Sequence, residues 1–386
     1  MHIAVVGGGL LGTTTALLAA DRGWSVDLIE KEPGLWTQTS TVNEGKVHLG
    51  PIFALGTPAT HDVMLRGALA FGRVLERAVG AGIDWGSMST LPFDYLVMPD
   101  SLATPDELAL IYSRMNELVP DGATYLGRPL DRLVDPAPGV DERTGLPIFH
   151  TDEIAVDPVR LGELLVGAVE SNPAITLRLG TEARSLDTVD GRAGVHLSDG
   201  SVLEYDLAVN AAWDQQLALL PSAAGLTRNY RLKTAIRIPV RDEHRPVTLV
   251  QGPYGDVVGH ADYTYASWYP EGRLSNEFAL VPSAETYALK ERIADPDFAS
   301  ALVARQLDAL RSVGVLPEGA TSGELFGGLI VGHGPTDIDA IDSALHSRSE
   351  FGTTVIGRVI VPSSFKFASA PLAAEEAVQT ALEVTG

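Results

Sequence analysis

The chain has 386 residues and a formal net charge of −22 at neutral pH, with 45% hydrophobic and 20% charged residues. This composition is ordinary for a soluble globular protein, and the length allows one large domain or two. The negative charge disfavours nucleic acid and anionic membrane surfaces as partners, because both attract basic surfaces. The sequence holds no cysteine, which excludes disulfides, thiolate metal sites and cysteine nucleophiles.

The first thirty residues predict a nucleotide-binding unit. A short apolar strand over residues 3–6 is followed by a glycine-rich turn, a helix over 13–20 and a second apolar strand over 26–29 that ends at Glu30. Although the stretch from 3 to 20 carries no charge, its glycines and threonines and the lack of a basic leader favour a strand and helix over a membrane span or signal segment. We therefore expect a cytoplasmic protein.

The turn has the G-x-G-x-x-G spacing of dinucleotide-binding folds. Gly7 allows the tight turn, Gly9 lets the backbone approach a pyrophosphate, and Gly12 lets the helix pack closely against the strand. The helix N-terminus offers N–H groups to the phosphates. Glu30 can accept hydrogen bonds from ribose hydroxyls, and an acid there favours FAD or NAD over NADP because it repels a 2′-phosphate.

The next part of the chain alternates between loops, helices and strands. A polar loop over 33–41 leads into residues 42–50, whose role is considered below. Periodicity then predicts a helix over 61–79, strands within 83–98, a helix over 106–118 that Thr104 caps and Pro105 opens, and a loop over 127–146.

The second half begins with a helix from Asp157 to 169 and a strand over 175–179. A small antiparallel meander over 183–205 and a buried strand over 207–210 follow, and alternation then predicts an antiparallel sheet between 229 and 281. The remaining elements are a helix over 298–313, strands over 326–332 and 354–361, and a closing helix over 373–384.

This order predicts an α/β fold in which a Rossmann-like FAD-binding domain carries an inserted antiparallel-sheet (α+β) substrate domain. We assign the discontinuous FAD-binding domain to residues 1–80, 151–225 and 326–386. The substrate domain takes residues 81–150 and 226–325. No repeat or low-complexity segment interrupts this division.

The sequence resembles the D-amino-acid oxidase superfamily of FAD-dependent oxidoreductases, which includes glycine oxidase and sarcosine oxidase. The resemblance covers nearly the whole chain. Four segments carry it, the first being residues 7–12 with Glu30. The second is the N-E-G-K-V-H-L-G run over 43–50, which is similar to the flavin-facing S-G-x-I-H-x-G loop of family members. The third is Asp157-Pro158 with N-A-A-W over 210–213, and the fourth is S-F-K-F-A-S over 364–369, which is similar to the family's G-F-K-F-S-S segment.

The resemblance implies FAD as the cofactor. Without cysteine the familiar cysteinyl attachment has no counterpart, so noncovalent FAD is expected, although His48 is also a candidate attachment point. The family often has Gly-His-Gly where this chain has Pro362-Ser363-Ser364. The predicted cofactor-binding residues are Gly7, Gly9, Leu10, Leu11, Gly12, Glu30, Lys31, Thr39, Ser40, Asn43, Gly45, Lys46, Val47, His48, Ala183, Ala211, Ala212, Trp213, Ser364, Phe365, Lys366 and Phe367.

Two residues are predicted to be catalytic. Lys366 lies between a buried strand and the closing helix, where a cation would stabilise the negative charge of a reduced flavin or pair with a substrate carboxylate; an exposed loop lysine is the alternative. His48 would hydrogen-bond the flavin or take a proton from substrate, or else pack within its own loop. Lys46 alternates with His48 and would point toward pyrophosphate or substrate, with solvent as the alternative.

The substrate is expected between the flavin and the antiparallel sheet. The aromatic-rich stretch over 254–269 would line the pocket or simply pack the sheet, and the candidate carboxylate clamps are Lys233, Arg237, Arg273 and Arg358. His333 and His346 stand among acids without metal-site spacing, so we predict a loop and no metal.

The leading functional hypothesis is a flavoenzyme that takes a hydride from the C–N bond of a small amine or amino acid and passes the electrons to dioxygen or another acceptor. The segment around Lys366 favours this amine chemistry. The loop at His48 favours the alternative, a 2-hydroxy-acid dehydrogenase of the same fold. A flavin-binding protein without catalysis, or one acting on a carrier-linked substrate, is the alternative of another class. The sequence leaves substrate, acceptor and oligomeric state open.

Overall fold

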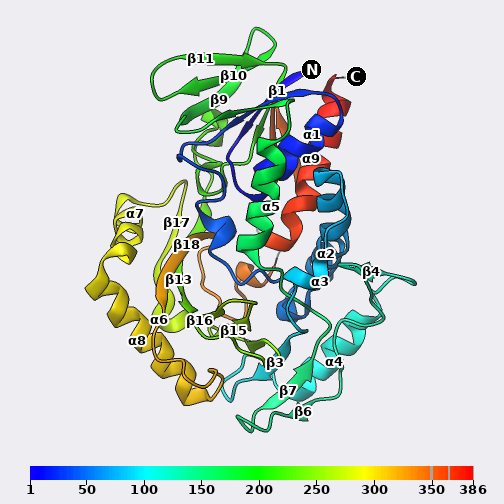
Figure 1. The fold of residues 1–386 in the computed structure, drawn as a ribbon, viewed down its shortest axis with the longest axis vertical. Coiled ribbons are helices and arrows are strands. Elements are labelled where there is room, and N and C mark those ends of the chain that lie inside the picture. The colour runs from blue at the N-terminus through cyan, green and yellow to red at the C-terminus, as the bar shows by residue number, and fades with distance from the viewer. Residues whose placement is uncertain (348–350, 364–365, 386) are drawn as a thin grey trace.

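The computed structural model describes residues 1–347, 351–363 and 366–385 (Figure 1). Its first layer is a six-stranded sheet in the order β19-β20-β12-β1-β2-β8. All neighbouring strands are parallel except β19 and β20, which form an antiparallel hairpin. The strands are β1 (His2–Val6), β2 (Ser25–Ile29), β8 (Ile175–Arg178), β12 (Leu207–Asn210), β19 (Gly352–Ile356) and β20 (Val359–Ser363).

Helices cover this sheet because its central strands are apolar on both faces. Ile3, Val5 and Leu28 are fully buried, which is typical of a parallel sheet enclosed by helices. The helices that pack together here are α1 (Leu10–Asp21), α2 (Pro58–Val79), α5 (Pro158–Glu170) and α9 (Ala370–Thr385), and Figure 1 shows α1 and α9 side by side. The N- and C-terminal segments therefore share one layer.

The second layer is a nine-stranded, mostly antiparallel sheet in the order β17-β13-β16-β15-β14-β3-β7-β6, with β18 also paired to β13. The strands are β3 (Asp94–Val97), β6 (Gly139–Val140), β7 (Pro147–His150), β13 (Arg228–Ile238), β14 (Val247–Val250), β15 (Gly255–Gly259), β16 (Thr264–Trp268), β17 (Arg273–Ala279) and β18 (Glu324–Gly332). Helix α8 (Pro296–Val313) packs on it and buries Leu302 and Leu307. Shorter helices α6 (Tyr269–Gly272) and α7 (Ala284–Glu291) lie nearby.

Smaller elements complete the fold. The predicted meander is a three-stranded sheet of β9 (Ala183–Val189), β10 (Arg192–Leu197) and β11 (Val202–Tyr205). Helix α4 (Pro105–Asn116) begins with the predicted Thr104 cap, which forms a capping box with Glu107. The others are α3 (Trp85–Met88), the pair β4 (Thr124–Tyr125) and β5 (Arg128–Pro129), and the 3₁₀ turns η1 (Thr39–Thr41), η2 (Pro51–Phe53), η3 (Trp213–Gln215), η4 (Pro221–Ala223), η5 (Arg292–Ala294), η6 (Ala344–His346) and η7 (Phe367–Ser369).

Two local expectations differ from the structure. Within 83–98 only β3 is a regular strand of any length, because Asp84 accepts a hydrogen bond from the Ser87 N–H and caps the short helix α3. Strand β18 pairs with β13 over nine residue pairs, whereas residues 326–332 were expected in the first layer. Alternation identified β18 as a strand, but not its partner. Among the described residues, no helix combines the length and apolarity needed to cross a membrane.

Candidate cofactor and substrate site

The glycine-rich turn is as tight as its spacing predicts. Gly7 has φ +110°, a conformation that L side chains rarely adopt. A Cβ on Gly12 would lie 1.8 Å from the Gly7 carbonyl oxygen, and one on Gly7 would lie 2.5 Å from the Ala211 oxygen. The turn, the start of α1 and the end of β12 are therefore packed backbone to backbone.

The N-terminus of α1 lies at the glycine turn. Its N-cap is Gly9, which has no side chain of its own to cap the helix. Leu10 N–H donates to Ser40 Oγ at 3.0 Å, and Thr13 hydroxyl accepts from the Trp36 indole at 3.0 Å, so the loop after β2 lies against this helix end. A helix N-terminus at a glycine turn is a favourable place for phosphate.

Glu30 sits at the tip of β2 beside the turn. Its carboxylate accepts from Gly8 N–H at 2.6 Å and from Glu32 N–H at 2.9 Å. The Glu30 carbonyl also accepts from Thr181 N–H at 2.9 Å, which brings the start of β9 and Ala183 toward this edge of the first sheet. Lys31 follows in sequence and is exposed.

The segment after β12 and the 3₁₀ turn η1 both meet β18. Trp213 donates its indole N–H to the Leu329 carbonyl at 2.8 Å, and Thr39 hydroxyl donates to the same oxygen at 3.3 Å. Ala211 N–H donates to the Val6 carbonyl at 2.8 Å, so residues predicted from distant segments converge on the glycine turn. The two layers are joined at this point.

The segment over 43–50 is held in an extended path. Asn43 accepts from Gly45 N–H at 2.8 Å, and Gly45 has φ +73° where a Cβ would lie 1.9 Å from the Val156 oxygen. Val47 N–H then donates to the Ile154 carbonyl at 3.0 Å. The buried Tyr125 hydroxyl donates to the Val47 carbonyl at 2.5 Å, so the loop is fixed from both sides.

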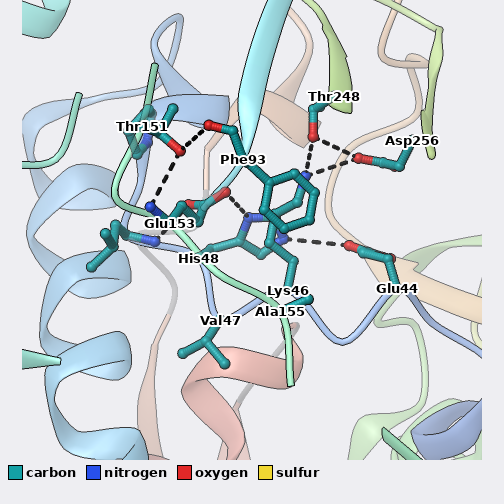
Figure 2. Close-up of polar contacts among 12 residues, drawn as sticks. Glu44, Lys46, Val47, His48, Phe93, Thr151, Glu153, Ala155, Thr248 and Asp256 are labelled. Carbon is teal, nitrogen blue, oxygen red and sulfur yellow. Dashed lines mark hydrogen bonds and ion pairs between the residues drawn. The ribbon is translucent and has the colours of Figure 1, made fainter. Parts of the chain in front are cut away.

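His48 is buried in a polar network that Figure 2 shows. Its Nδ1 lies 3.6 Å from Glu153 and its Nε2 lies 3.7 Å from Glu44. Glu153, fully buried, accepts from Leu49 N–H at 2.7 Å and from the Tyr95 hydroxyl at 2.6 Å. Burial lowers the pKa of His48 despite Glu153, so the imidazole is neutral at pH 7.

Lys46 points away from His48, as alternation predicts, and enters the second layer. Its buried ammonium donates to Asp256 at 2.8 Å and to Thr248, and it lies 4.2 Å from the centre of the Phe93 ring. Burial opposes ionisation of Asp256, yet Lys46 and Lys233 hold the pKa of its carboxyl far below the usual range. This ion pair satisfies the lysine, so we interpret Lys46 as a tether between the 43–50 loop and β15.

Lys366 and His48 both lie against the ring of Phe53. The Lys366 ammonium lies 5.1 Å from the centre of the Phe53 ring, and the His48 ring lies 5.7 Å from the same centre. The charge of Lys366 helps to lower the pKa of His48 after burial. Phe367 packs on Phe71 of α2 with ring centres 5.4 Å apart. The two residues predicted to be catalytic, 318 positions apart by their numbers (366 − 48), thus share one region.

Among the predicted residues, Ser364 and Phe365 lie outside the part of the chain that the structure describes. Other residues of this region were not foreseen. Sequence patterns did not single out Glu153, Tyr95, Thr248 and Asp256. Its place directly before the apolar run over 154–156 is the one signal that could have identified Glu153, although the neighbouring Asp152 shares most of that signal. The described residues contain no group of three or more His and acidic side chains placed to hold a metal.

Residues 2–311 match the family model described as "DAO: FAD dependent oxidoreductase". The chain belongs to this family. It is therefore an FAD-dependent oxidoreductase, in agreement with the resemblance seen in its motifs.

Curated relatives align with short parts of the chain. The bifunctional protein MnmC of tRNA 5-methylaminomethyl-2-thiouridine biosynthesis from Pseudomonas aeruginosa is 41% identical over 87 residues, which are 22% of this chain and 13% of that protein. D-amino acid dehydrogenase from Methylobacterium radiotolerans is 39% identical over 61 residues, 15% of each protein. The chain thus aligns with well under two thirds of the length of these relatives.

Solved structures align over nearly the whole chain. Glycine oxidase from Geobacillus kaustophilus has a TM-score of 0.63 at 15% identity, covering 99% of this chain and 94% of that one. Iminodiacetate oxidase from Chelativorans sp. BNC1 has a TM-score of 0.65 at 17% identity, covering 100% and 95%. The FAD-bound L-α-glycerophosphate oxidase from Mycoplasma pneumoniae has a TM-score of 0.65 at 16% identity, covering 99% and 94%. At such identities the likeness establishes the shared fold, which confirms the predicted α/β class.

The residues present fit FAD. The α1 N-terminus, whose N-cap residue is a glycine, suits its pyrophosphate, and glycines leave the turn free of Cβ atoms where backbone segments meet. Glu30 stands at the tip of the second strand, where this class of fold places its ribose-binding acid.

Proposed function

We propose that this FAD-dependent oxidoreductase oxidises the C–N bond of a small amine or amino acid, with dioxygen or another acceptor taking the electrons. The observation that carries the proposal is the buried His48, whose pKa burial lowers, and the Lys366 ammonium, which lies against the same Phe53 ring. The names of related proteins agree in chemistry: glycine oxidase, iminodiacetate oxidase and D-amino acid dehydrogenase.

Noncovalent FAD supplies the hydride acceptor when bound. We propose that residues 7–12 and Glu30 hold its adenosine diphosphate part and that 43–50, 211–213 and 366–367 lie along its flavin. An amine must lose its ammonium proton before it can give up a hydride. Neutral His48 can accept that proton, because an imidazole with a lowered pKa stays unprotonated at physiological pH.

Glu153 and Lys366 have distinct parts in this scheme. Glu153 holds the Leu49 N–H and the Tyr95 hydroxyl, which keeps the backbone next to His48 in place. Lys366 provides positive charge where either a substrate carboxylate or a reduced cofactor would add negative charge. The imine formed from an amino acid would then be hydrolysed by water to a keto acid.

A 2-hydroxy-acid dehydrogenase is the second candidate. The same neutral His48 can take a proton from a hydroxyl, so its geometry serves both substrates. The fold of L-α-glycerophosphate oxidase is equally similar. The alternative therefore differs in the substrate and not in the residues that hold it.

The test is anaerobic reduction of the FAD-loaded protein by a panel of amino acids, N-substituted amines and matched 2-hydroxy acids. The absorbance of oxidised flavin near about 450 nm, a property of the cofactor, is followed after each addition. Bleaching by an amine and not by its hydroxy analogue supports the proposal, and the reverse result supports the alternative. A protein that binds FAD but is bleached by no compound in either series contradicts both. Admitting air afterwards separates an oxidase, which recovers its colour rapidly, from a dehydrogenase.

A further inference from the structure

A buried arginine on β13 has more hydrogen-bond donors than the structure uses. Arg231 is 3% exposed, and among the described residues its Nε has no hydrogen-bond partner. Its Nη1 donates to the Tyr269 hydroxyl at 3.1 Å. A guanidinium carries five N–H donors, and leaving them unpaired in a buried place costs free energy unless a ligand satisfies them.

Arg231 belongs to a cluster with one acid. Tyr269 donates to Asp337 Oδ1 at 2.7 Å, and Arg273 Nε lies 3.1 Å from Asp337 Oδ2. The Arg231 Nη1 lies 3.8 Å from Oδ1, an ion-pair distance too long for a good hydrogen bond. Both guanidinium groups lie close to the Tyr269 ring centre, at 5.9 and 5.8 Å. Two cations and a hydroxyl thus converge on a single carboxylate.

The two sides of this cluster differ in how they are held. Arg231 and Arg273 lie on neighbouring strands β13 and β17, and burial raises the pKa of Tyr269 to about 12, so its hydroxyl stays a donor. Asp337 lies in an irregular segment over 333–347 in which Thr336, Asp339 and Asp342 are exposed. Its Oδ1 also accepts from its neighbour Ile338 N–H at 2.7 Å. The carboxylate is therefore the partner that can move without disturbing a sheet.

The cluster lies on the face of the second layer that looks toward the 43–50 loop. Side chains two apart in a strand share a face, so Arg231 lies on the same face as Lys233. Lys233 Nζ is 4.0 Å from Asp256, which also pairs with Lys46 of the 43–50 loop.

We propose that Arg231, Arg273 and Tyr269 form a binding subsite for a carboxylate ligand, and that Asp337 is an internal carboxylate that occupies this subsite until the ligand displaces it. A planar guanidinium suits a carboxylate, and the ligand would offer two free oxygens where Asp337 reaches Arg231 at one long distance. Naming the ligand as the carboxylate of the substrate rests on the proposed function. The subsite itself does not, because it can be measured without turnover.

The test measures binding of acetate, propionate and butyrate to the FAD-loaded protein by isothermal titration calorimetry at constant ionic strength, with the corresponding amides as neutral controls. Asp337→Asn removes the competing charge while keeping the shape of the side chain. We expect it to tighten carboxylate binding by about tenfold or more, since it leaves two cations without an anion, and to leave amide binding unchanged. Asp339→Asn is the matched control, because it removes the same charge from an exposed position of the same segment.

A second variant separates the subsite from general electrostatics. Adding Arg231→Gln to Asp337→Asn is expected to return carboxylate binding to the wild-type level or below. The proposal is overturned if Asp337→Asn and Asp339→Asn change affinity equally, if Asp337→Asn weakens binding, or if the added Arg231→Gln has no effect. Circular dichroism and FAD content check that each variant is folded. Because no substrate is oxidised in these titrations, failure of the proposed amine oxidation leaves their outcome interpretable.

Discussion

Replacing Gly12 by alanine tests whether the glycine turn needs its close backbone contact. The added Cβ would lie 1.8 Å from the Gly7 carbonyl oxygen, whereas ordinary contacts of a Cβ begin at 3.4 Å. The turn and α1 would have to separate by about the difference, 1.6 Å (3.4 − 1.8), and no flexible side chain is available to absorb it. Overpacking of this kind costs about 1–3 kcal/mol or more.

That displacement moves the N-terminus of α1 away from the position that suits the pyrophosphate. A loss of about 3 kcal/mol corresponds to a rise of roughly 100-fold in the dissociation constant. We therefore expect Gly12→Ala to weaken FAD binding by about two orders of magnitude, measured by titrating apoprotein with FAD and following flavin fluorescence.

Gly167 provides the control, because it lies in helix α5 and a Cβ added there would meet nothing within 4 Å. Gly167→Ala is expected to raise the free energy of unfolding by about 0.5–1 kcal/mol through better helix propensity, with FAD affinity unchanged. If Gly12→Ala bound FAD as tightly as the wild type, the close packing of the turn would not be needed for the cofactor, and the reasoning would be wrong.

Three further results are expected. Lys46→Met removes the closer of the two lysines that pair with Asp256 and leaves Lys233 at 4.0 Å, so denaturant unfolding should show a loss of up to about 3–5 kcal/mol. Adding Asp256→Asn to Lys46→Met should recover a large part of this loss, and an equal loss in the single and the double variant would show that the pair is not coupled. Burial lowers the pKa of His260 from an ordinary value near 6.5 to about 4. The unfolded chain therefore binds the proton first, and the free energy of unfolding falls as the pH drops from 6.5 toward 4. His260→Asn should remove on the order of 3 kcal/mol of this pH dependence, and an unchanged slope of unfolding free energy against pH would contradict the prediction. Since burial also lowers the pKa of His48, the acidic limb of the kcat/KM profile should lie below 6.5 and disappear in His48→Asn, whereas a limb that persists there belongs to another group.

Local patterns in the sequence predicted most of the regular elements and the fingerprint. The spacing of Gly7, Gly9 and Gly12 specifies a strand–turn–helix unit because its requirements are met within a dozen residues. The Thr104 cap and the helical periodicity over 61–79 are equally local, and the structure confirms both. The exception at α3 is also local, since the Asp84 cap was present in the sequence and was missed.

The partners of these elements could not be predicted in the same way. Alternation identifies β18 as a strand but carries no information on which edge it joins, and it joins β13. Alternation also showed that Lys46 and His48 point to opposite sides, without showing what either side holds. Asp256 lies 210 positions after Lys46, and Glu153 lies 105 positions after His48 (153 − 48).

The sequence by itself determined the α/β class, the glycine turn with its acid, and the family, because each depends on neighbours along the chain. Only the tertiary structure decided that Lys46 tethers the loop to β15, that Glu153 supports His48, and that Asp337 lies between Arg231 and Arg273. Burial is the physical reason. The charge state of a side chain and the energy of its ion pairs depend on the loss of water, and which groups lose water is set when distant segments pack together.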